Sequence, residues 1–268
     1  MTDQSFSVEQ LDTSRPHPAR MYDYFLGGRD NYQVDREAAQ RVLGELPDIL
    51  PTARENRAFL HRAVRHVVRS GVRQILDIGT GIPTSPNTHE VALAEDPTVR
   101  VAYVDNDPIV AVHAGARLTG APGTGFALGD VRDPAALLEL PAIRDRIDLG
   151  RPVAVLLVAV LHFVTDEEDP YAIVATLRDA LPAGSHLVLS HATADFHPGD
   201  HTETMQAYRS STATMNPRTH AEVVRLFDGF DLLEPGVVQL PRWRPDGDPP
   251  TPGELRRIGF YGGVARKD

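Results

Sequence analysis

Three aspartates end successive short apolar runs and could together hold a polar ligand. Asp77 ends the run VRQILD, Asp105 ends VRVAYVD, and Asp130 ends GFALGD. A carboxylate accepts hydrogen bonds from an ammonium group or from hydroxyls, and such charged bonds contribute about 1.5–3 kcal/mol each. If the runs are neighbouring parallel strands, their carboxyl ends share the edge at which open α/β sheets bind ligands. The spacing therefore predicts one ligand site held by the three acids.

The loop after Asp77 narrows the identity of that ligand. Two glycines, Gly79 and Gly81, let the backbone approach a ligand closely. The dinucleotide fingerprint needs a third glycine where Thr84 stands, and no Walker lysine follows. The frame D-x-G-x-G looks like the first motif of class I S-adenosylmethionine (SAM) methyltransferases. We therefore expect Asp77 to meet the methionine ammonium, and the backbone of Gly79, Thr80 and Gly81 to hold the rest of that group.

The other two acids suit the nucleoside part of SAM. Asp105 can accept from both ribose hydroxyls; Asp107 is its rival, but it precedes a proline and suits a helix cap. Asp130 stands where these enzymes often bind the adenine amino group. Asn106 takes the place of an apolar residue that commonly packs on adenine, and Val131 completes the expected cofactor contacts.

Long blocks of the chain resemble one bacterial family, the S-adenosyl methyltransferases long catalogued as a domain of unknown function. These blocks are ARMYDYFLGGRDNY (19–32), ENRAFLHRAVR (55–65), QILDIGTGIPTSPNTHEV (74–91), YVDNDP (103–108), RPVAVLLVAVLHFV (151–164) and LSHAT (189–193). The resemblance covers nearly the whole chain and implies SAM as cofactor, without naming an acceptor. It also implies that Pro83, in place of the usual third glycine, is a family feature. Because proline lacks a donor, cofactor contacts there must differ from the common pattern.

Two histidines and an aspartate are the candidates for the chemical step. Methyl transfer from a sulfonium is an in-line displacement that needs positioning and sometimes a base. His162 follows the fourth apolar run and His191 ends the fifth, so both are expected to face the cleft beside the methyl group; Asp166 is a third candidate. Neutral histidine suits proton removal from a hydroxyl or amine near pH 7. A lone histidine in an apolar run is also often a packed core residue, and that alternative stays open for His162.

A second group of histidines raises the question of a metal. His191, Asp195, His197 and His201 lie close together in SHATADFHPGDH. These are metal-ligand types, but their spacing matches no familiar site, so a polar loop is the preferred interpretation. We expect the segment 192–220 to cover the acceptor site.

The N-terminal block is the other predicted cover. Its sequence MYDYFLGGRDNY combines amphipathic aromatic residues with a glycine pair that permits a sharp bend. We expect residues 1–70 to form a helical extension that closes over SAM, with contacts from Arg20, Tyr24 and Asn31. The alternative is a helix packed on the sheet and stopped by glycine.

The remaining pattern predicts the elements that position these residues. Across 71–268 the apolar runs near 72–77, 99–105, 125–130, 153–159 and 186–191 alternate with helical stretches near 87–95, 108–119, 134–144 and 170–181. Asp107, Asp133 and Asp169 each precede a proline, as helix caps do. Buried strands that alternate with helices indicate a doubly wound, Rossmann-like α/β domain with a mostly parallel sheet.

Both ends of the chain depart from this alternation. The sequence predicts two helices before Gly71. The first covers residues 34–47. The second begins at Thr52, which has capping-box spacing to Glu55. Near the C-terminus, the strand candidates Leu232–Leu240 and Arg257–Ala265 have no crossover helix between them and should pair antiparallel. An antiparallel C-terminal hairpin matches the methyltransferase sheet and not the NAD-binding one.

Composition limits the classes of function. The 268 residues suit one large domain, and a formal charge of −10 argues against nucleic-acid or acidic-membrane partners. The absence of cysteine excludes disulfides, thiolate catalysis and Cys-bound metal. The start MTDQSFSVEQ lacks the features of a signal peptide, and the longest apolar run, 153–161, is too short to span a bilayer, so a cytoplasmic location is expected.

We interpret the chain as a SAM-dependent methyltransferase that acts on a small molecule; its acceptor and its oligomeric state are open. Two alternatives remain. The protein could be a SAM-binding sensor without catalysis, or an NAD(P)-dependent oxidoreductase, which Thr84 and the antiparallel tail disfavour.

Overall fold

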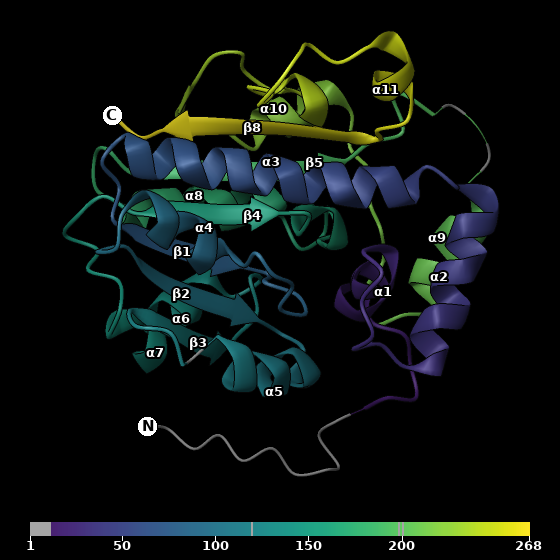
Figure 1. The fold of residues 1–268 in the computed structure, drawn as a ribbon, viewed down its shortest axis with the longest axis horizontal. Helices are drawn as coiled ribbons and strands as arrows, with labels where there is room; N and C mark the ends of the chain where they lie inside the picture. The colour runs from purple at the N-terminus through teal and green to yellow at the C-terminus, as the bar shows by residue number, and fades with distance from the viewer. Residues whose placement is uncertain (1–11, 119, 198, 200) are drawn as a thin grey trace.

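The computed structural model describes residues 12–118, 120–197, 199 and 201–268. Its centre is a sheet with helices on both faces, and a separate helical layer lies beyond the end toward which the parallel strands point (Figure 1). The five parallel strands are β1 (Gln74–Ile78), β2 (Arg100–Asp105), β3 (Thr124–Leu128), β4 (Ala154–Val158) and β5 (His186–Ala192). The strand order β3-β2-β1-β4-β5-β8-β6 reverses direction of travel at β1, which confirms a doubly wound sheet.

The five crossover helices are α4 (Thr88–Glu95), α5 (Pro108–Arg117), α6 (Pro134–Glu139), α7 (Pro141–Arg144) and α8 (Pro170–Ala180). Three of them, α5, α6 and α8, begin at the acid–proline pairs found in the sequence. Asp107, Asp133 and Asp169 each accept a hydrogen bond from a backbone N–H in the first turn, at 2.9–3.1 Å. The prediction of one helix over 134–144 is wrong, because Pro141 holds Leu140 extended and divides it into α6 and α7.

The C-terminal end of the sheet is antiparallel, as expected. β8 (Phe260–Arg266) pairs with β5 on one side, and with β6 (Asp231–Leu232) and β7 (Val238–Gln239) on the other. The expected continuous strand over 232–240 is wrong, because a turn closed by the Gly236 N–H on Leu233 O, 2.8 Å, separates β6 from β7. The short helices η3 (Leu240–Arg242), α10 (His220–Arg225) and α11 (Pro252–Arg256) complete this region.

The N-terminal region is helical and contributes to both the core and the separate layer. It forms α1 (Pro18–Phe25), α2 (Gln33–Glu45) and α3 (Ile49–Arg69). The expected capping box at Thr52 is wrong: the helix begins at Ile49, and the Thr52 hydroxyl instead donates to Arg257 O at 3.0 Å. The apolar stripe of α3 packs in the same core cluster as one face of the sheet, while α6 and α8 pack in the cluster on the other face.

The separate layer joins segments that are far apart in sequence. α1 and α2 lie there beside α9 (Thr202–Arg209), which comes from the expected cover segment 192–220 (Figure 1). Within the described part of the chain, no helix has both the length and the apolar character that crossing a membrane requires.

Candidate active site

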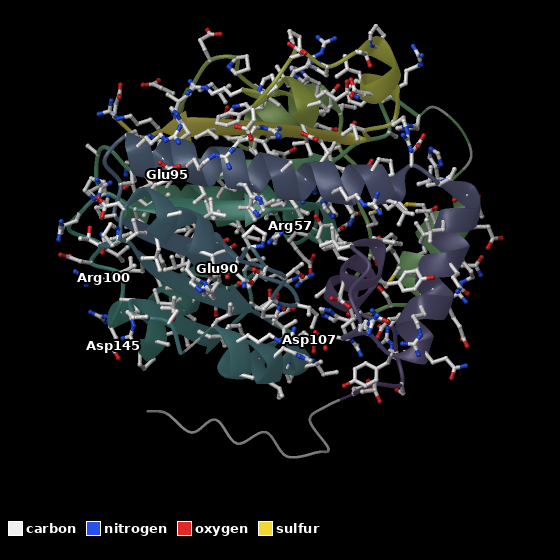
Figure 2. The ribbon with its side chains drawn as sticks, in the orientation of Figure 1. Arg57, Glu90, Glu95, Arg100, Asp107 and Asp145 are labelled. Carbon is white, nitrogen blue, oxygen red and sulfur yellow. The ribbon has the colours of Figure 1, made fainter. Side chains whose placement is uncertain are left out.

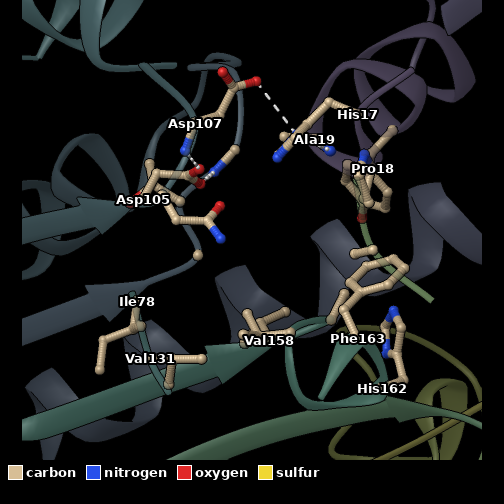
Figure 3. A pocket seen from close by; sticks show the side chains of 18 of the residues that line it. His17, Pro18, Ala19, Ile78, Asp105, Asp107, Val131, Val158, His162 and Phe163 are labelled. Atoms are coloured by element: carbon tan, nitrogen blue, oxygen red, sulfur yellow. Dashed lines mark hydrogen bonds and ion pairs between the residues drawn. The ribbon is translucent and has the colours of Figure 1, made fainter. Parts of the chain in front are cut away.

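A cavity of about 340 Å³ opens between the carboxyl ends of the parallel strands and the helical layer. That volume falls within the usual range for small-molecule sites, about 300–1,000 Å³. Asp105 and Asp107 line one end, while His162 and Phe163 line the opposite end, with Val158 between them (Figure 3). The two ends therefore offer different chemistry, one acidic and one aromatic.

The glycine loop after β1 is held in a conformation that its sequence requires. Gly79 has φ +75°, and a Cβ atom there would lie 2.3 Å from Cγ2 of Val160. The N–H groups of Gly79 and Thr80 both donate to Val104 O, at 2.8 and 3.0 Å, so the loop crosses the end of β2. Gly81, with φ +67°, borders the cavity and meets no atom within 4 Å of a Cβ position. A ligand can therefore approach the backbone at this point.

Asp77 is buried at the end of β1, beneath this loop. Its Oδ2 accepts a hydrogen bond from the Thr88 hydroxyl at 2.6 Å, and its side chain borders the cavity. Burial raises the pKa of Asp77 to about 6, against the opposing effects of that hydrogen bond and of Arg57. A positively charged ligand group placed here would restore the ionised form.

Asp105 ties the glycine loop to the start of α5. Its Oδ2 accepts from the Gly81 N–H at 2.7 Å and its Oδ1 accepts from the Asp107 N–H at 3.0 Å. Burial is the main cause that raises the pKa of Asp105 to about 6. Each oxygen keeps a second lone pair, so the carboxylate can still accept from a ligand.

Asp107 also borders the cavity and connects it to the N-terminal helices. Its Oδ1 caps α5, while its Oδ2 lies 3.4 Å from Arg20 Nε and 3.3 Å from His17 Nδ1. Arg20 is 1% exposed and also lies 3.6 Å from Asp35, so a buried cation joins the extension to the sheet. Figure 2 shows Asp107 beside α1 and well below Arg57, which lies on α3.

The expected adenine contacts meet beyond the ends of β2 and β3. Asn106 Nδ2 donates to Asp130 Oδ2 at 3.3 Å, and both residues line the cavity with the buried Val131. Asp130 also accepts from the Arg132 N–H at 2.9 Å. The structure therefore brings these three predicted residues together.

His162 lies at the aromatic end, in the 3₁₀ turn η2 (Leu161–Phe163). Its Nδ1 accepts from the Ala192 N–H at 3.4 Å, so the neutral ring carries its proton on Nε2. Burial, followed by the charges of His191 and Arg218, holds the pKa of His162 well below its usual value. The imidazole is therefore an uncharged side chain in an aromatic setting.

His191 does not line the cavity, although the sequence led us to expect it there. It is fully buried, its Nδ1 donates to Ala192 O at 2.8 Å, and its Nε2 accepts from Arg218 Nη1 at 3.0 Å. Arg218 also donates to Leu161 O at 2.9 Å and to Val164 O at 3.0 Å. His191 therefore supports the turn that carries His162, and both of its ring nitrogens are occupied.

Three further candidates lie outside the cavity. Asp166 has a side chain 79% exposed and accepts from Arg218 at 2.7 Å. The Tyr24 hydroxyl accepts from Gln40 Nε2 at 3.4 Å, and Asn31 Nδ2 donates to Asp23 at 2.7 Å. Of the expected N-terminal contacts, the structure places Arg20 alone at the cavity, among the residues it describes.

Other cavity residues were missed in the sequence. They include His17, Tyr22, Asn56, Arg57 and Tyr208. The Tyr22 hydroxyl donates to Ala53 O at 2.9 Å and accepts from Asn56 Nδ2 at 3.0 Å. The available signal was the position of Asn56 within the apolar stripe of α3, three and four residues before Phe59 and Leu60.

The described residues of the histidine-rich segment form no metal site. Across the ranges the structure describes, no group of three His, Asp or Glu side chains is placed to hold a metal ion. His201 Nε2 instead lies 2.6 Å from His197 O.

The strand order, the antiparallel β8 and the acidic glycine-loop site together define a class I, Rossmann-like methyltransferase fold. Residues 4–268 match the model of the S-adenosyl methyltransferase family, and the chain belongs to that family. Its cofactor is accordingly S-adenosylmethionine.

Solved structures support the same assignment. A DUF574 family protein from Streptomyces avermitilis is 44% identical, with a TM-score of 0.92 over 96% of this chain and 100% of that one. A protein from Thermobifida fusca is 38% identical, with a TM-score of 0.89 over 96% of this chain and 97% of its own. No curated protein matches the chain.

Proposed function

We propose that this protein transfers the methyl group of SAM to a small-molecule acceptor held at the aromatic end of the cavity. The observation that carries the proposal is the single cavity with two unlike ends, one acidic and one uncharged. A cofactor at the acidic end leaves the other end for the acceptor, and aligned reactants supply much of the rate enhancement of a displacement.

The cofactor contacts follow from the donors and acceptors around the acidic end. Asp77 accepts from the methionine ammonium, because a cation there offsets the burial of its carboxylate. Asp105 accepts from the ribose hydroxyls with its free lone pairs. Asn106 and Val131, which line the cavity, would hold the adenine, and Asp130 would accept from its amino group.

The N-terminal residues 1–70 and the segment 192–220 act as covers over the domain formed by 71–268. Two contacts support this role. Arg20 pairs with Asp107 beside the proposed ribose site, and the Thr212 N–H donates to Pro16 O at 3.1 Å, so the covers also contact each other. Water exclusion by such covers strengthens the charged contacts that they enclose.

Calorimetry with the full chain tests the proposal. We expect SAM and S-adenosylhomocysteine to bind and to raise the melting temperature, and NAD to do neither, because NAD has no ammonium group to offset the buried charge of Asp77. Indifference to all three ligands would contradict the proposal. A sensor without catalysis is distinguished by incubation with SAM and a pool of metabolites, since an enzyme releases S-adenosylhomocysteine and a sensor does not.

A further inference from the structure

We propose that the methyl acceptor is an aromatic acid that binds as its anion and accepts hydrogen bonds at the reacting oxygen from His162 and Tyr208. The inference rests on the proposed function, because it names the acceptor class for the same cavity. Phenolates and aryl carboxylates share the required chemistry, an ionised oxygen attached to an aromatic ring.

The walls of the acceptor end are aromatic and uncharged. Phe163, Tyr208, Met215 and Phe260 line it, and the rings of Phe163 and Tyr208 lie 5.6 Å apart between centroids. The His162 ring lies 5.4 Å from that of Phe260. Such walls favour a flat apolar skeleton, which gains from ring–ring contacts as well as from burial.

The charged group next to this end is already neutralised. Arg132 Nη2 donates to Phe163 O at 2.9 Å, but its guanidinium also pairs with Asp130 and Glu168. An acceptor with several charges would therefore find no free partners on these walls. One charge is compatible with the site, because the sulfonium of SAM supplies the opposite charge.

The polar atoms at this end are donors. Since His162 Nδ1 accepts from Ala192, its Nε2–H is the free group, and among the described residues it has no acceptor. The Tyr208 side chain is 5% exposed, and its hydroxyl likewise has no hydrogen-bond partner in the described part of the chain. Burial raises the pKa of Tyr208, so this hydroxyl keeps its proton. Two groups that can both donate match an oxygen anion better than an ammonium or amine, whose N–H groups could be accepted by the Tyr208 oxygen alone.

The reaction balances without a base. The anionic oxygen attacks the methyl carbon, an O–C bond forms, the C–S bond breaks and its electron pair goes to sulfur. The oxygen and the sulfonium each lose their charge, and no proton moves. A neutral hydroxyl would need a base, and His162 already carries its proton at Nε2. Because both charges vanish, apolar walls do not oppose the transition state.

Four probes with one ring each test the acceptor class in the SAM-saturated protein: 4-nitrophenol, benzoate, benzyl alcohol and benzylamine. We expect the two acids to bind at least about tenfold more tightly than the alcohol and the amine, because one charged hydrogen bond is worth about that factor or more. Visible absorption should show 4-nitrophenol bound as its phenolate, with methylation measured as S-adenosylhomocysteine release. Comparison of the two dissociation constants then shows whether the site prefers a phenolate or an aryl carboxylate.

Variants of His162 show whether this residue acts as a hydrogen-bond donor or as a base. His162→Gln keeps an N–H donor and should bind and methylate the preferred acid within about threefold of wild type, whereas His162→Phe should bind it about 10–100-fold more weakly. Tyr208→Phe should weaken binding about tenfold, and Tyr171→Phe, which removes a hydroxyl on α8 next to Arg225, should change nothing. SAM affinity should be the same in all of them.

Three results obtained with a bound probe would overturn the inference. They are binding of 4-nitrophenol as the neutral phenol, preference for benzylamine, and loss of methylation in His162→Gln with binding intact, which would make His162 a base. Failure of all four probes to bind while SAM binds would also overturn it. Failure of SAM itself to bind would instead contradict the proposed function.

Discussion

Arg218 Nη1 lies 3.0 Å from His191 Nε2 and 2.9 Å from Leu161 O, so one buried guanidinium joins the end of β5 to the turn that carries His162. The Asn216 N–H also donates to His162 O at 2.7 Å. Residues of the segment 192–220 therefore hold the turn of the cavity histidine through its backbone. His191 acts on that turn through Arg218 and also directly, because its ring lies 5.5 Å from the His162 ring between centroids.

The first prediction concerns this connection. Arg218→Lys should lower the free energy of unfolding by about 2–4 kcal/mol, because a lysine cannot reach two carbonyls and an imidazole together. Urea denaturation measures this change. Arg225→Lys, where the guanidinium stacks on Tyr171 instead, is the matched control and should cost less than about 1 kcal/mol. Equal costs for the two variants would contradict the proposed role of Arg218.

The second prediction concerns the ribose contact. Asp105→Ala should weaken SAM binding at least about tenfold, because it removes the acceptor for the hydroxyls and also frees the Gly81 N–H. Calorimetry measures the dissociation constant. Asp246→Ala, which breaks an exposed pair with Arg65, should leave it unchanged. Unchanged SAM affinity in Asp105→Ala would shift the ribose assignment to Asp107.

The third prediction is a pH dependence of SAM binding. Burial raises the pKa of Asp77 to about 6, and the ammonium of SAM requires the ionised form. Affinity should therefore fall as the pH drops through about 6, by about tenfold per pH unit below that point. In Asp77→Asn the affinity for SAM should be lower at neutral pH. The part of its pH dependence that comes from Asp77 should be absent. A wild-type affinity that is constant between pH 7 and pH 5 would count against this contact.

The fourth prediction concerns the effect of the raised pKa of Asp77 on the unfolding free energy of the protein without SAM. The pKa of Asp77 is higher in the folded chain than its ordinary value of 3.8, so the unfolded chain loses the proton first as pH rises. The cost of burying the ionised carboxylate is absent below about pH 4 and complete above about pH 6. From pH 4 to pH 7, Asp77→Asn should therefore gain about 3 kcal/mol in unfolding free energy relative to wild type. Parallel stability curves for the two proteins would contradict the shift.

The fifth prediction concerns Gly79. It separates the cost of placing a side chain at positive φ from the cost of its contact with Val160. Gly79→Ala should destabilise the fold by more than about 2 kcal/mol, because the new methyl group would meet Val160 and the backbone has a positive φ. Gly27→Ala has a positive φ but no atom within 4 Å, and should cost about 1 kcal/mol. Adding Val160→Ala to Gly79→Ala should recover part of the loss. No recovery in that double variant would show that the collision is not the cause.

The sequence predicted well the features that depend on neighbouring residues. The acids at the ends of β1 and β2, the three aspartate caps and the antiparallel pairing of β8 all follow from local spacing or from the length of a connection. The prediction that Thr52 caps a helix was wrong because its hydroxyl donates to a distant partner, Arg257 O, which local spacing cannot reveal.

The orientation of side chains at the cavity was harder to predict. All seven residues of β5 are buried, so its sequence has no polar face to show which way His191 points. In α1, Tyr22 and Phe25, which are three residues apart, line the cavity, while Tyr24 lies outside it. Both outcomes depend on which surface the helix or strand packs against, and that partner lies far away in the sequence.

The contact of Pro16 O with the Thr212 N–H has a consequence for how the protein is made. The two residues are separated by 196 positions, and Arg15 reaches Ser211 O at 2.6 Å across the same distance along the chain. At about 5–20 residues per second, a ribosome takes about 10–40 s to synthesise the residues between the first of these segments and the second. Through that interval α1 has no partner on α9 or the segment after it, and the roof of the cavity is incomplete. The cavity, which Tyr208, Thr212 and Met215 line together with residues of α1, is therefore complete only after both segments have been synthesised.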